Sequence, residues 1–238
     1  PIPDTIAAIP GQQSYLRIVH AAPAVEGVDF DINGLMFAVG LEYGRFTQPT
    51  PLVAGSYTLR LTRSDASDTE SDLILQPFDL LTGQTLLVIL TGTLEAPSLL
   101  LQPENVSPLA SGEHSIQIIN TITGGGEITV TRNDTPLAGP LAVLTTSAPA
   151  PASEGTSVIR VVGVGEQSLV DVLELREQRR YLLIVTGDTT IAGSLQIISL
   201  ESRVPGQAFL RVIHALPEIG NVDVYLSGKR LLDSFASF

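Results

Sequence analysis

Histidines are the side chains of this sequence best suited to acid–base catalysis or metal binding, and two of them occupy matching positions. His20 ends the segment "LRIVH", directly before "AAP", and His214 ends "LRVIH", directly before "ALP". Each imidazole could act as a general base or a metal ligand, or it could hydrogen-bond the backbone of the following turn. A related segment, "IQIIN", carries Asn120 at this position, and an amide can stabilise a turn but cannot serve as a base. We therefore interpret His20, His214 and Asn120 as structural residues of a turn, and we find no partner for His114.

Carboxylates gather in two segments that could bind calcium. The segment "DFDING" (29–34) matches the D-x-D-x-N-G start of a calcium loop, but Gly40 occupies the twelfth position, where such a loop has glutamate. The alternative is that these aspartates form the outward face of a strand whose inward face is apolar. The segment "SDASDTESD" (64–72) is the better candidate, with a solvated hairpin loop as its alternative. Its carboxylates are Asp65, Asp68, Glu70 and Asp72. Apart from calcium, the sequence suggests no metal or cofactor.

The rest of the composition argues against enzymatic and nucleic-acid functions. The chain has no cysteine, G-x-S-x-G elbow or phosphate-binding loop, so we predict no enzymatic activity. A net charge of −12, with only 13 scattered basic residues, opposes nucleic-acid binding, because phosphate recognition needs clustered lysine and arginine. No apolar run approaches the roughly 18 residues that a membrane-spanning helix needs, so we predict no membrane insertion. The chain begins at Pro1 without a leader-like segment, and we expect either a processed chain or a piece of a longer one.

Internal repetition organises the chain. The segments "LRIVHAAPAVEGVDFDING" (16–34) and "LRVIHALPEIGNVDVYLSG" (210–228) match without a gap at an offset of 194 residues. A weaker copy lies at an offset of 100, where "LRIVH" becomes "IQIIN" and "AGSYTLRLT" becomes "EGTSVIRVV". The offset then falls to 95, where "TLLVILTG" becomes "RYLLIVTG". This repetition predicts an N-terminal extension (1–13), two complete domains that we call repeat 1 (14–108) and repeat 2 (113–204), and an incomplete third copy (208–238).

The repeated blocks have the two-residue period of half-buried strands. In "VDFDING", apolar residues occupy one face, aspartates the other, and Asn33-Gly34 predicts a turn with positive φ. The segment "LLVIL" (86–90) is apolar on both faces, as expected of a central strand. Short strands separated by Gly and Pro predict an all-β fold of tandem Ig-like antiparallel β-sandwich domains, followed by the opening strands of a third. The residues expected to face the core include Leu16, Ile18, Val28, Phe30, Tyr57, Leu59 and Val88.

The pattern "LRIVHAAP…VDFDING", followed by "AGSYTLRLT" and "TLLVILTG", resembles the domain of unknown function 4397 family. The hallmark of that family is an R-x-x-H-A-x-P strand followed by a V-D-V strand. Repeat 1 carries the pattern from Arg17 to Gly92, and the third copy carries its first third, from Arg211 to Gly228. Repeat 2 departs from it, with "NTIT" (120–123) in place of H-A-x-P. The resemblance implies prokaryotic, mostly exported β-sandwich domains and an extracellular or cell-surface location, and it transfers no catalytic residue.

The incomplete third copy is the best indication of function. An isolated pair of strands is marginal in water, because it has no second sheet on which to bury its apolar face. Either the chain is a slice of a longer array, or its tail is missing, or another chain completes the sandwich. We expect the last, with the third copy packed against another copy of the same chain by strand addition. The residues expected in this contact are Leu210, Val212, Val222, Val224 and Leu226, together with Ile6 and Ile9 of the N-terminal extension. We predict a non-catalytic structural subunit of a prokaryotic extracellular assembly, such as a filament, sheath or surface layer, joined by inter-subunit β-strand contacts. The alternative is a surface-anchored adhesion module that binds glycans or proteins through loops such as 64–72.

Overall fold

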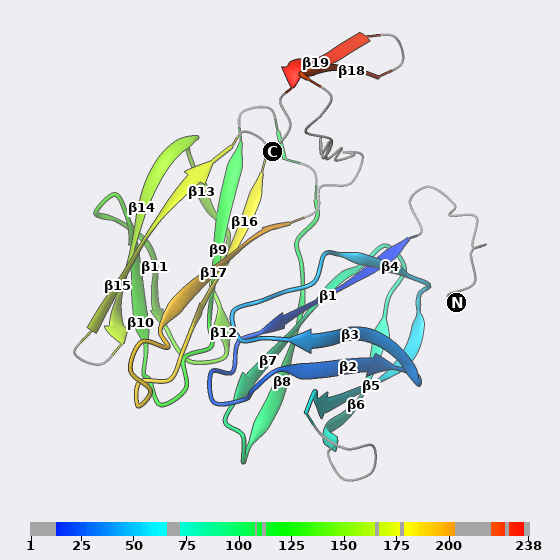
Figure 1. Ribbon diagram of the computed structural model, residues 1–238. Helices are drawn as coiled ribbons and strands as arrows, with labels where there is room; N and C mark the ends of the chain where they lie inside the picture. The colour runs from blue at the N-terminus through cyan, green and yellow to red at the C-terminus, as the bar shows by residue number, and fades with distance from the viewer. Residues whose placement is uncertain are drawn as a thin grey trace. The chain divides into compact units, whose positions relative to one another are not determined.

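The computed structural model describes residues 13–65, 72–107, 109–110, 113–164, 167–176, 179–202, 220–226 and 229–235 (Figure 1). Every regular element in these ranges is a β-strand, which confirms the predicted all-β fold of tandem sandwiches. The same ranges contain no helix long and apolar enough to cross a membrane. Residues 1–205 and residues 206–238 form two separate units.

Repeat 1 folds into a sandwich of two four-stranded sheets. Its strands are β1 (Ser14–His20), β2 (Val28–Ile32), β3 (Leu35–Leu41), β4 (Thr50–Leu52), β5 (Gly55–Arg63), β6 (Asp72–Leu80), β7 (Thr85–Gly92) and β8 (Pro97–Pro103). The strand order is β4-β1-β7-β8 in one sheet, which we call the inner sheet, and β3-β2-β5-β6 in the outer sheet. All neighbours are antiparallel except β1 and β7, which run parallel, a pairing that the sequence did not predict.

Repeat 2 builds the same sandwich with the same registers. Its strands are β9 (His114–Asn120), β10 (Ile128–Arg132), β11 (Thr135–Leu141), β12 (Thr145–Thr146), β13 (Ala150–Ala152), β14 (Gly155–Val164), β15 (Gln167–Leu175), β16 (Arg180–Thr186) and β17 (Gln196–Ser202). The inner sheet has the order β12-β9-β16-β17, with β13 also on β9, and the outer sheet has the order β11-β10-β14-β15. Ile18 lies opposite Val88 in repeat 1, and Ile118 lies opposite Leu183 in repeat 2, as the offsets predict.

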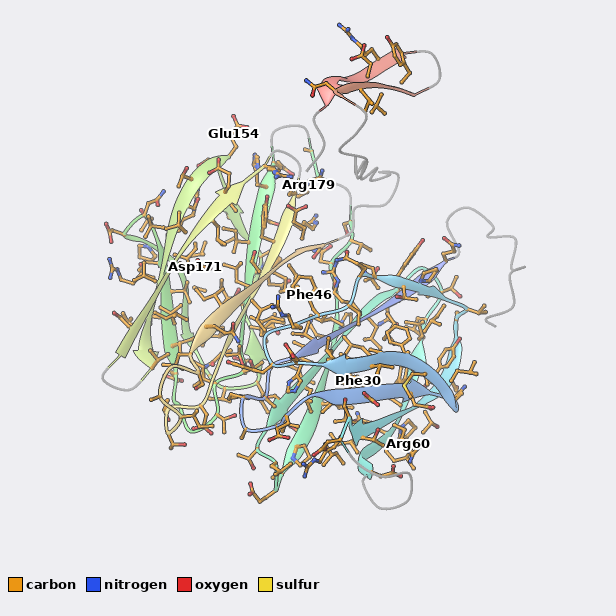
Figure 2. All side chains as sticks on the ribbon, viewed as in Figure 1. Phe30, Phe46, Arg60, Glu154, Asp171 and Arg179 are labelled. Carbon is orange, nitrogen blue, oxygen red and sulfur yellow. The ribbon has the colours of Figure 1, made fainter. Side chains whose placement is uncertain are left out.

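Each sandwich has its own core, and alternation along the strands decides which side chains enter it. On β2, Val28 and Phe30 are fully buried, whereas Asp29 and Asp31, which alternate with them, are partly exposed. Phe30 is labelled in Figure 2. Of the seven residues expected to face the core, six are buried. The exception is Tyr57, which is half-buried and stacks on Phe78 with ring centroids 5.6 Å apart.

A third core joins the two repeats and explains the doubly apolar strand β7. Leu86, Val88 and Leu90 point into the core of repeat 1. Leu87 and Ile89 point the other way, into a cluster shared with the inner sheet of repeat 2. The two inner sheets therefore pack face to face and are buried on both sides, with one outer sheet on each flank. We call this contact the seam.

The third copy contributes a hairpin, described by itself, of β18 (Val222–Leu226) and β19 (Lys229–Phe235). Val222 lies opposite Phe235 and Val224 opposite Leu232, with the same two register shifts that occur between β2 and β3 and between β10 and β11. Val222 and Val224 are half-buried, whereas their counterparts Val28 and Phe30 are fully buried. The hairpin is therefore equivalent to the β2–β3 hairpin of repeat 1 and the β10–β11 hairpin of repeat 2. The expected strand at 209–214, with Leu210 and Val212, lies outside the described residues, as do Ile6, Ile9 and the side chain of Leu226.

Candidate functional site

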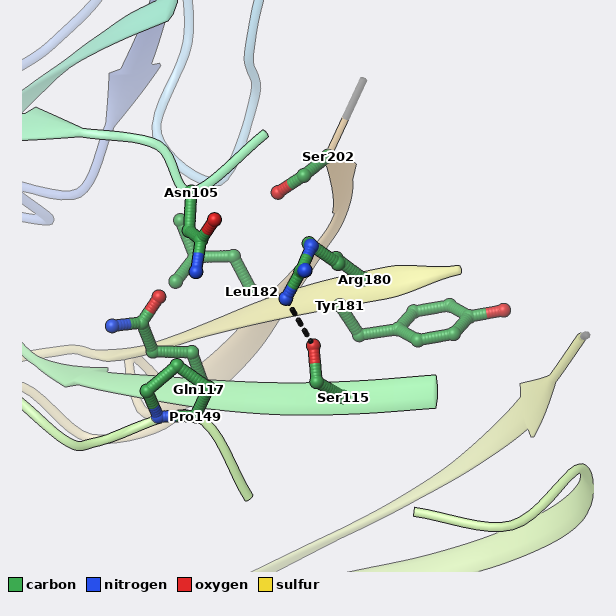
Figure 3. Close-up of a pocket in the computed structure, with 8 residues that line it drawn as sticks. All are labelled: Asn105, Ser115, Gln117, Pro149, Arg180, Tyr181, Leu182 and Ser202. Atoms are coloured by element: carbon green, nitrogen blue, oxygen red, sulfur yellow. Dashed lines mark hydrogen bonds between the residues drawn. The ribbon is translucent and has the colours of Figure 1, made fainter. Parts of the chain in front are cut away.

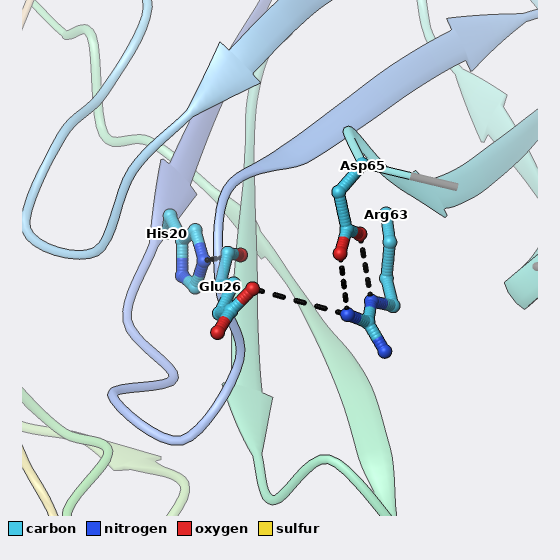
Figure 4. Close-up of polar contacts among 4 residues, drawn as sticks. All are labelled: His20, Glu26, Arg63 and Asp65. Carbon is cyan, nitrogen blue, oxygen red and sulfur yellow. Dashed lines mark hydrogen bonds and ion pairs between the residues drawn. The ribbon is translucent and has the colours of Figure 1, made fainter. Parts of the chain in front are cut away.

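His20 is a fully buried structural residue of the turn that follows β1. The backbone N–H of Ala22 donates to Nδ1 over 3.3 Å, so the ring proton is on Nε2, which donates to the carbonyl of Glu26 over 3.1 Å (Figure 4). Burial lowers the pKa of His20, and this favours the neutral imidazole that the two bonds require. The ring spans the turn from its second to its sixth residue and has no proton free for catalysis.

Asn120 makes the equivalent bonds in repeat 2 with a different side chain. Its Oδ1 accepts from the N–H of Ile122 over 3.1 Å, and its Nδ2 donates to the carbonyl of Gly126 over 3.2 Å. A further bond from Nδ2 reaches the carbonyl of Leu141 over 3.0 Å. A neutral imidazole offers one acceptor and one donor, and an amide offers an acceptor and two donors, so both side chains satisfy the same turn and the amide has a donor left for Leu141. His214 lies outside the described residues.

His114, which had no recognisable partner in the sequence, also bonds the backbone. Its Nδ1 lies 3.0 Å from the carbonyl of Arg176, across repeat 2 from its own strand. The sequence carried no signal for this contact, because the two residues are 62 positions apart. Both described histidines thus serve the fold.

The acidic segment 64–72 pairs its described carboxylates with arginines. Asp65 accepts two hydrogen bonds from Arg63, of 3.0 and 2.7 Å, and Arg63 also lies 3.8 Å from Glu26 (Figure 4). These bonds lower the pKa of Asp65. Asp72 accepts from Arg60 over 2.6 Å. The other two calcium candidates, Asp68 and Glu70, lie outside the described residues. Within the described ranges, no three His, Asp or Glu side chains lie close enough together to hold a metal ion.

The seam has a local two-fold pattern. Thr91 on β7 directs its hydroxyl at the carbonyl of Thr121 in repeat 2, over 3.4 Å. Thr186, the counterpart of Thr91, donates to the carbonyl of Ala21, the counterpart of Thr121, over 2.7 Å. The apolar residues of the seam match in the same way, as Val19 with Ile119, Leu87 with Leu182 and Ile89 with Ile184. The repeats therefore meet through equivalent surfaces, as the subunits of a symmetric dimer do.

A buried charge pair lies within the seam, and sequence reasoning missed it. Arg17 on β1 is 4% exposed and donates from Nη2 to the carbonyl of Glu201 in repeat 2, over 3.1 Å. Its Nη1 lies 3.8 Å from the fully buried carboxylate of Glu104. Among the described residues, neither carboxylate oxygen of Glu104 and neither the Nε nor the Nη1 of Arg17 has a hydrogen-bond partner. Burial raises the pKa of Glu104 and lowers that of Arg17, while the charge of each partner opposes these shifts.

A small cavity of about 10 Å³ lies at the start of strands β9 and β16 (Figure 3). Its lining residues are Asn105, Ser115, Gln117, Pro149, Arg180, Tyr181, Leu182 and Ser202. Arg180 donates to Ser115 Oγ over 3.1 Å, and two further bonds to the carbonyl of Ser107 hold the segment that connects the repeats. The volume suits about one water molecule, so the cavity is too small for a substrate.

These features define a class of protein, the tandem β-sandwich protein whose complete repeats pair face to face. The profile of the family described as "Domain of unknown function (DUF4397)" matches residues 14–131 and 115–225. The chain belongs to this family, as the sequence pattern predicted.

Comparison with other proteins adds little about function. A comparison with curated proteins found no match. A solved structure described as "The Bacillus anthracis TIE protein" is similar at 14% identity and a TM-score of 0.24, over 74% of this chain and 34% of that one. The chain thus spans about a third of the length of that protein. A TM-score of 0.24 is too low for this likeness to bear on function.

Proposed function

We propose that the chain is a non-catalytic structural subunit of a prokaryotic extracellular assembly whose subunits join through β-strand contacts. The main support for this proposal is the pairing of β18, which has fewer partner strands among the described residues than its counterparts in the complete repeats. In the complete repeats, the equivalent strand lies between two partners, since β2 pairs with β3 and β5, and β10 pairs with β11 and β14. Within the described ranges, β18 pairs with β19 alone.

The complete repeats also indicate what kind of strand would complete the hairpin. Leu61 and Leu59 of β5 lie opposite Phe30 and Ile32 of β2, and all four side chains are buried. The counterparts of Phe30 and Ile32 on β18 are Val224 and Leu226. A completing strand should therefore run antiparallel to β18 with apolar residues at alternate positions, so that backbone bonds give affinity and side chains give register. We propose that a neighbouring copy of the chain supplies this strand, in a filament, sheath or surface layer.

The remaining architecture supports a structural role. The described histidines stabilise turns, and the described carboxylates of the acidic segment are paired with arginine. The seam joins two sandwiches through a shared apolar core, which suits a stiff building block. The extracellular location rests on the family resemblance of the sequence pattern.

Oligomeric state tests the proposal directly. The full chain should assemble as its concentration rises, as followed by light scattering and electron microscopy, and a chain ending at Pro205 should give folded monomers. Val224→Lys places a charge on the apolar face of β18 and should prevent assembly. Asp223→Asn, a change on the opposite face of the same strand, is the control and should assemble normally. Assembly of the shortened chain or of the Val224→Lys variant, or a full chain that stays monomeric, would contradict the proposal.

The second candidate function is an adhesion module that binds glycans or proteins. An open cleft between the two repeats, lined by Ser98 of repeat 1 and Val143 of repeat 2 among others, favours it. For that function, the full chain should be monomeric and should melt at a higher temperature in the presence of its ligand.

A further inference from the structure

The local two-fold pattern gives the seam two equivalent ends, and one of them is filled by side chains. At that end, Tyr43 of repeat 1 reaches repeat 2, where its hydroxyl donates to the carbonyl of Ser194. Gln196 at the start of β17 packs so closely on Gly44 that a Cβ atom there would lie 2.6 Å from its Nε2. Tyr43 and Gln196 together close this end of the seam.

The other end has smaller residues at the same two positions. The counterpart of Tyr43 is Val143, at an offset of 100. The counterpart of Gln196 is Ser98, because Gln196 lies opposite Thr186 and Ser98 lies opposite Thr91. With the phenol ring and the long amide both missing, this end holds an open cleft of about 390 Å³. Its lining residues are Thr91, Gly92, Ser98, Ile122, Thr123, Gly124, Gly125, Val143 and Leu144.

Leu144 is a second, independent sign that the cleft is a binding site. Its φ of 60° lies in the left-handed region, which a leucine rarely adopts, whereas its counterpart Gly44 holds the similar φ of 79° without strain. Leu144 is 46% exposed, so it adds little to the apolar core. Strained, exposed residues of this kind concentrate where a ligand is held.

We propose that this cleft binds a tyrosine side chain presented by a partner protein. The filled end shows that a phenol ring fits between the repeats and that its hydroxyl reaches a polar group across the seam. In the cleft, Val143 and Leu144 offer apolar surface to the ring. Ser98 and Thr123 are also lining residues, and a hydroxyl side chain can hydrogen-bond the phenol hydroxyl. The volume falls within the range of about 300–1,000 Å³ typical of ligand sites. This inference does not depend on the proposed assembly.

Two matched variants test the proposal with N-acetyl-L-tyrosinamide as the probe and NMR titration of the full chain as the measurement. The wild-type chain should bind one equivalent, with shifts centred on Val143 and Leu144. Ser98→Gln with Val143→Tyr rebuilds the filled end in the cleft and should abolish binding. Tyr43→Val with Gln196→Ser opens the filled end and should add a second equivalent. N-acetyl-L-phenylalaninamide, which lacks the hydroxyl, should bind roughly fivefold to tenfold more weakly, the ratio expected for one lost hydrogen bond.

Several outcomes would overturn the inference. These are no binding to the wild-type chain, unchanged binding to the variant with the filled cleft, or equal affinity for the two probes. The filling variant adds side chains without removing any core residue, so its fold can be checked by its melting temperature. If the opening variant fails to fold, the filling variant alone decides the question.

Discussion

Two substitutions at His20 should distinguish the stability that its hydrogen bonds contribute from the stability that the packing of its ring contributes. His20→Leu leaves the buried N–H of Ala22 and the partly buried carbonyl of Glu26 without their side-chain partner. Each unpaired group costs about 1–3 kcal/mol, so the variant should lose about 2–6 kcal/mol of unfolding free energy. His20→Asn keeps an acceptor and a donor, the arrangement that Asn120 shows in repeat 2. It loses only ring packing, including the edge contact with Tyr43 at 6.2 Å, and should cost about 1–2 kcal/mol.

Urea unfolding followed by circular dichroism measures these costs, and pH gives a second readout. Burial lowers the pKa of His20 below 6.5, its value in an unfolded chain, so the unfolded state takes up a proton first as pH falls. The stability contributed by His20 is therefore complete above pH 6.5 and decreases as pH falls from there toward the folded-state pKa. The advantage of wild type over His20→Asn should shrink across this window. An asparagine variant as unstable as the leucine variant, or an advantage independent of pH, would refute this reasoning.

Three further predictions concern the core and the seam, each tested by urea unfolding. Phe30→Ala should cost about 3–5 kcal/mol because the ring is fully buried, and a loss below about 1 kcal/mol would mean that β2 faces the other way. Glu104→Leu should cost about 3–5 kcal/mol of unfolding free energy, because it leaves the charge of Arg17 buried without its carboxylate partner. The double variant with Arg17→Leu should regain most of this stability. A double variant whose loss equals the sum of the two single losses would contradict this prediction. Thr186→Val should cost about 1 kcal/mol of unfolding free energy, because it removes the 2.7 Å hydrogen bond to the carbonyl of Ala21. Thr91→Val should cost less, because the corresponding bond to Thr121 is longer, at 3.4 Å. A larger cost for Thr91→Val would contradict the geometry of the seam.

The fold of each repeat was predictable because a strand with one buried face and one exposed face alternates apolar and polar residues in the sequence. The alternation from Val28 to Ile32 reports which face is buried, and the offsets of 100 and 95 align two such strand sets. The packing of the two repeats against each other was harder to predict from the sequence. Apolar residues on both faces of 86–90 indicated a central strand, but Leu87 and Ile89 do not reveal that a second sandwich covers them. Arg17 gave no signal, since a charge on the second face of a strand usually meets water.

The cleft needs the structure for a similar reason. The change from Tyr43 to Val143 is visible when the repeats are aligned at an offset of 100. The change from Gln196 to Ser98 is not, because the loops before β8 and β17 differ in length and the offset there is 98. Strand pairing with Thr91 and Thr186 establishes that correspondence. Only the packing of the inner sheets then brings the two positions together at one end of the seam.

The outer edges of the complete repeats bear on where strand addition can occur. Pro77 lies in the edge strand β6 opposite Thr58 and has no N–H to offer a further strand. The equivalent position on β15 is Val172, opposite Val158. Its N–H donates to Oδ1 of its neighbour Asp171 over 2.8 Å, and Asp171 is labelled in Figure 2. Two unrelated side chains thus block the same backbone group, a device that natural sheets use against unwanted pairing. These two features discourage a further strand at β6 and at β15, whereas the sequence of β18, "VDVYL", contains no proline. This difference fits the proposed assembly, in which a neighbouring copy adds its strand at β18 and not at these two edges.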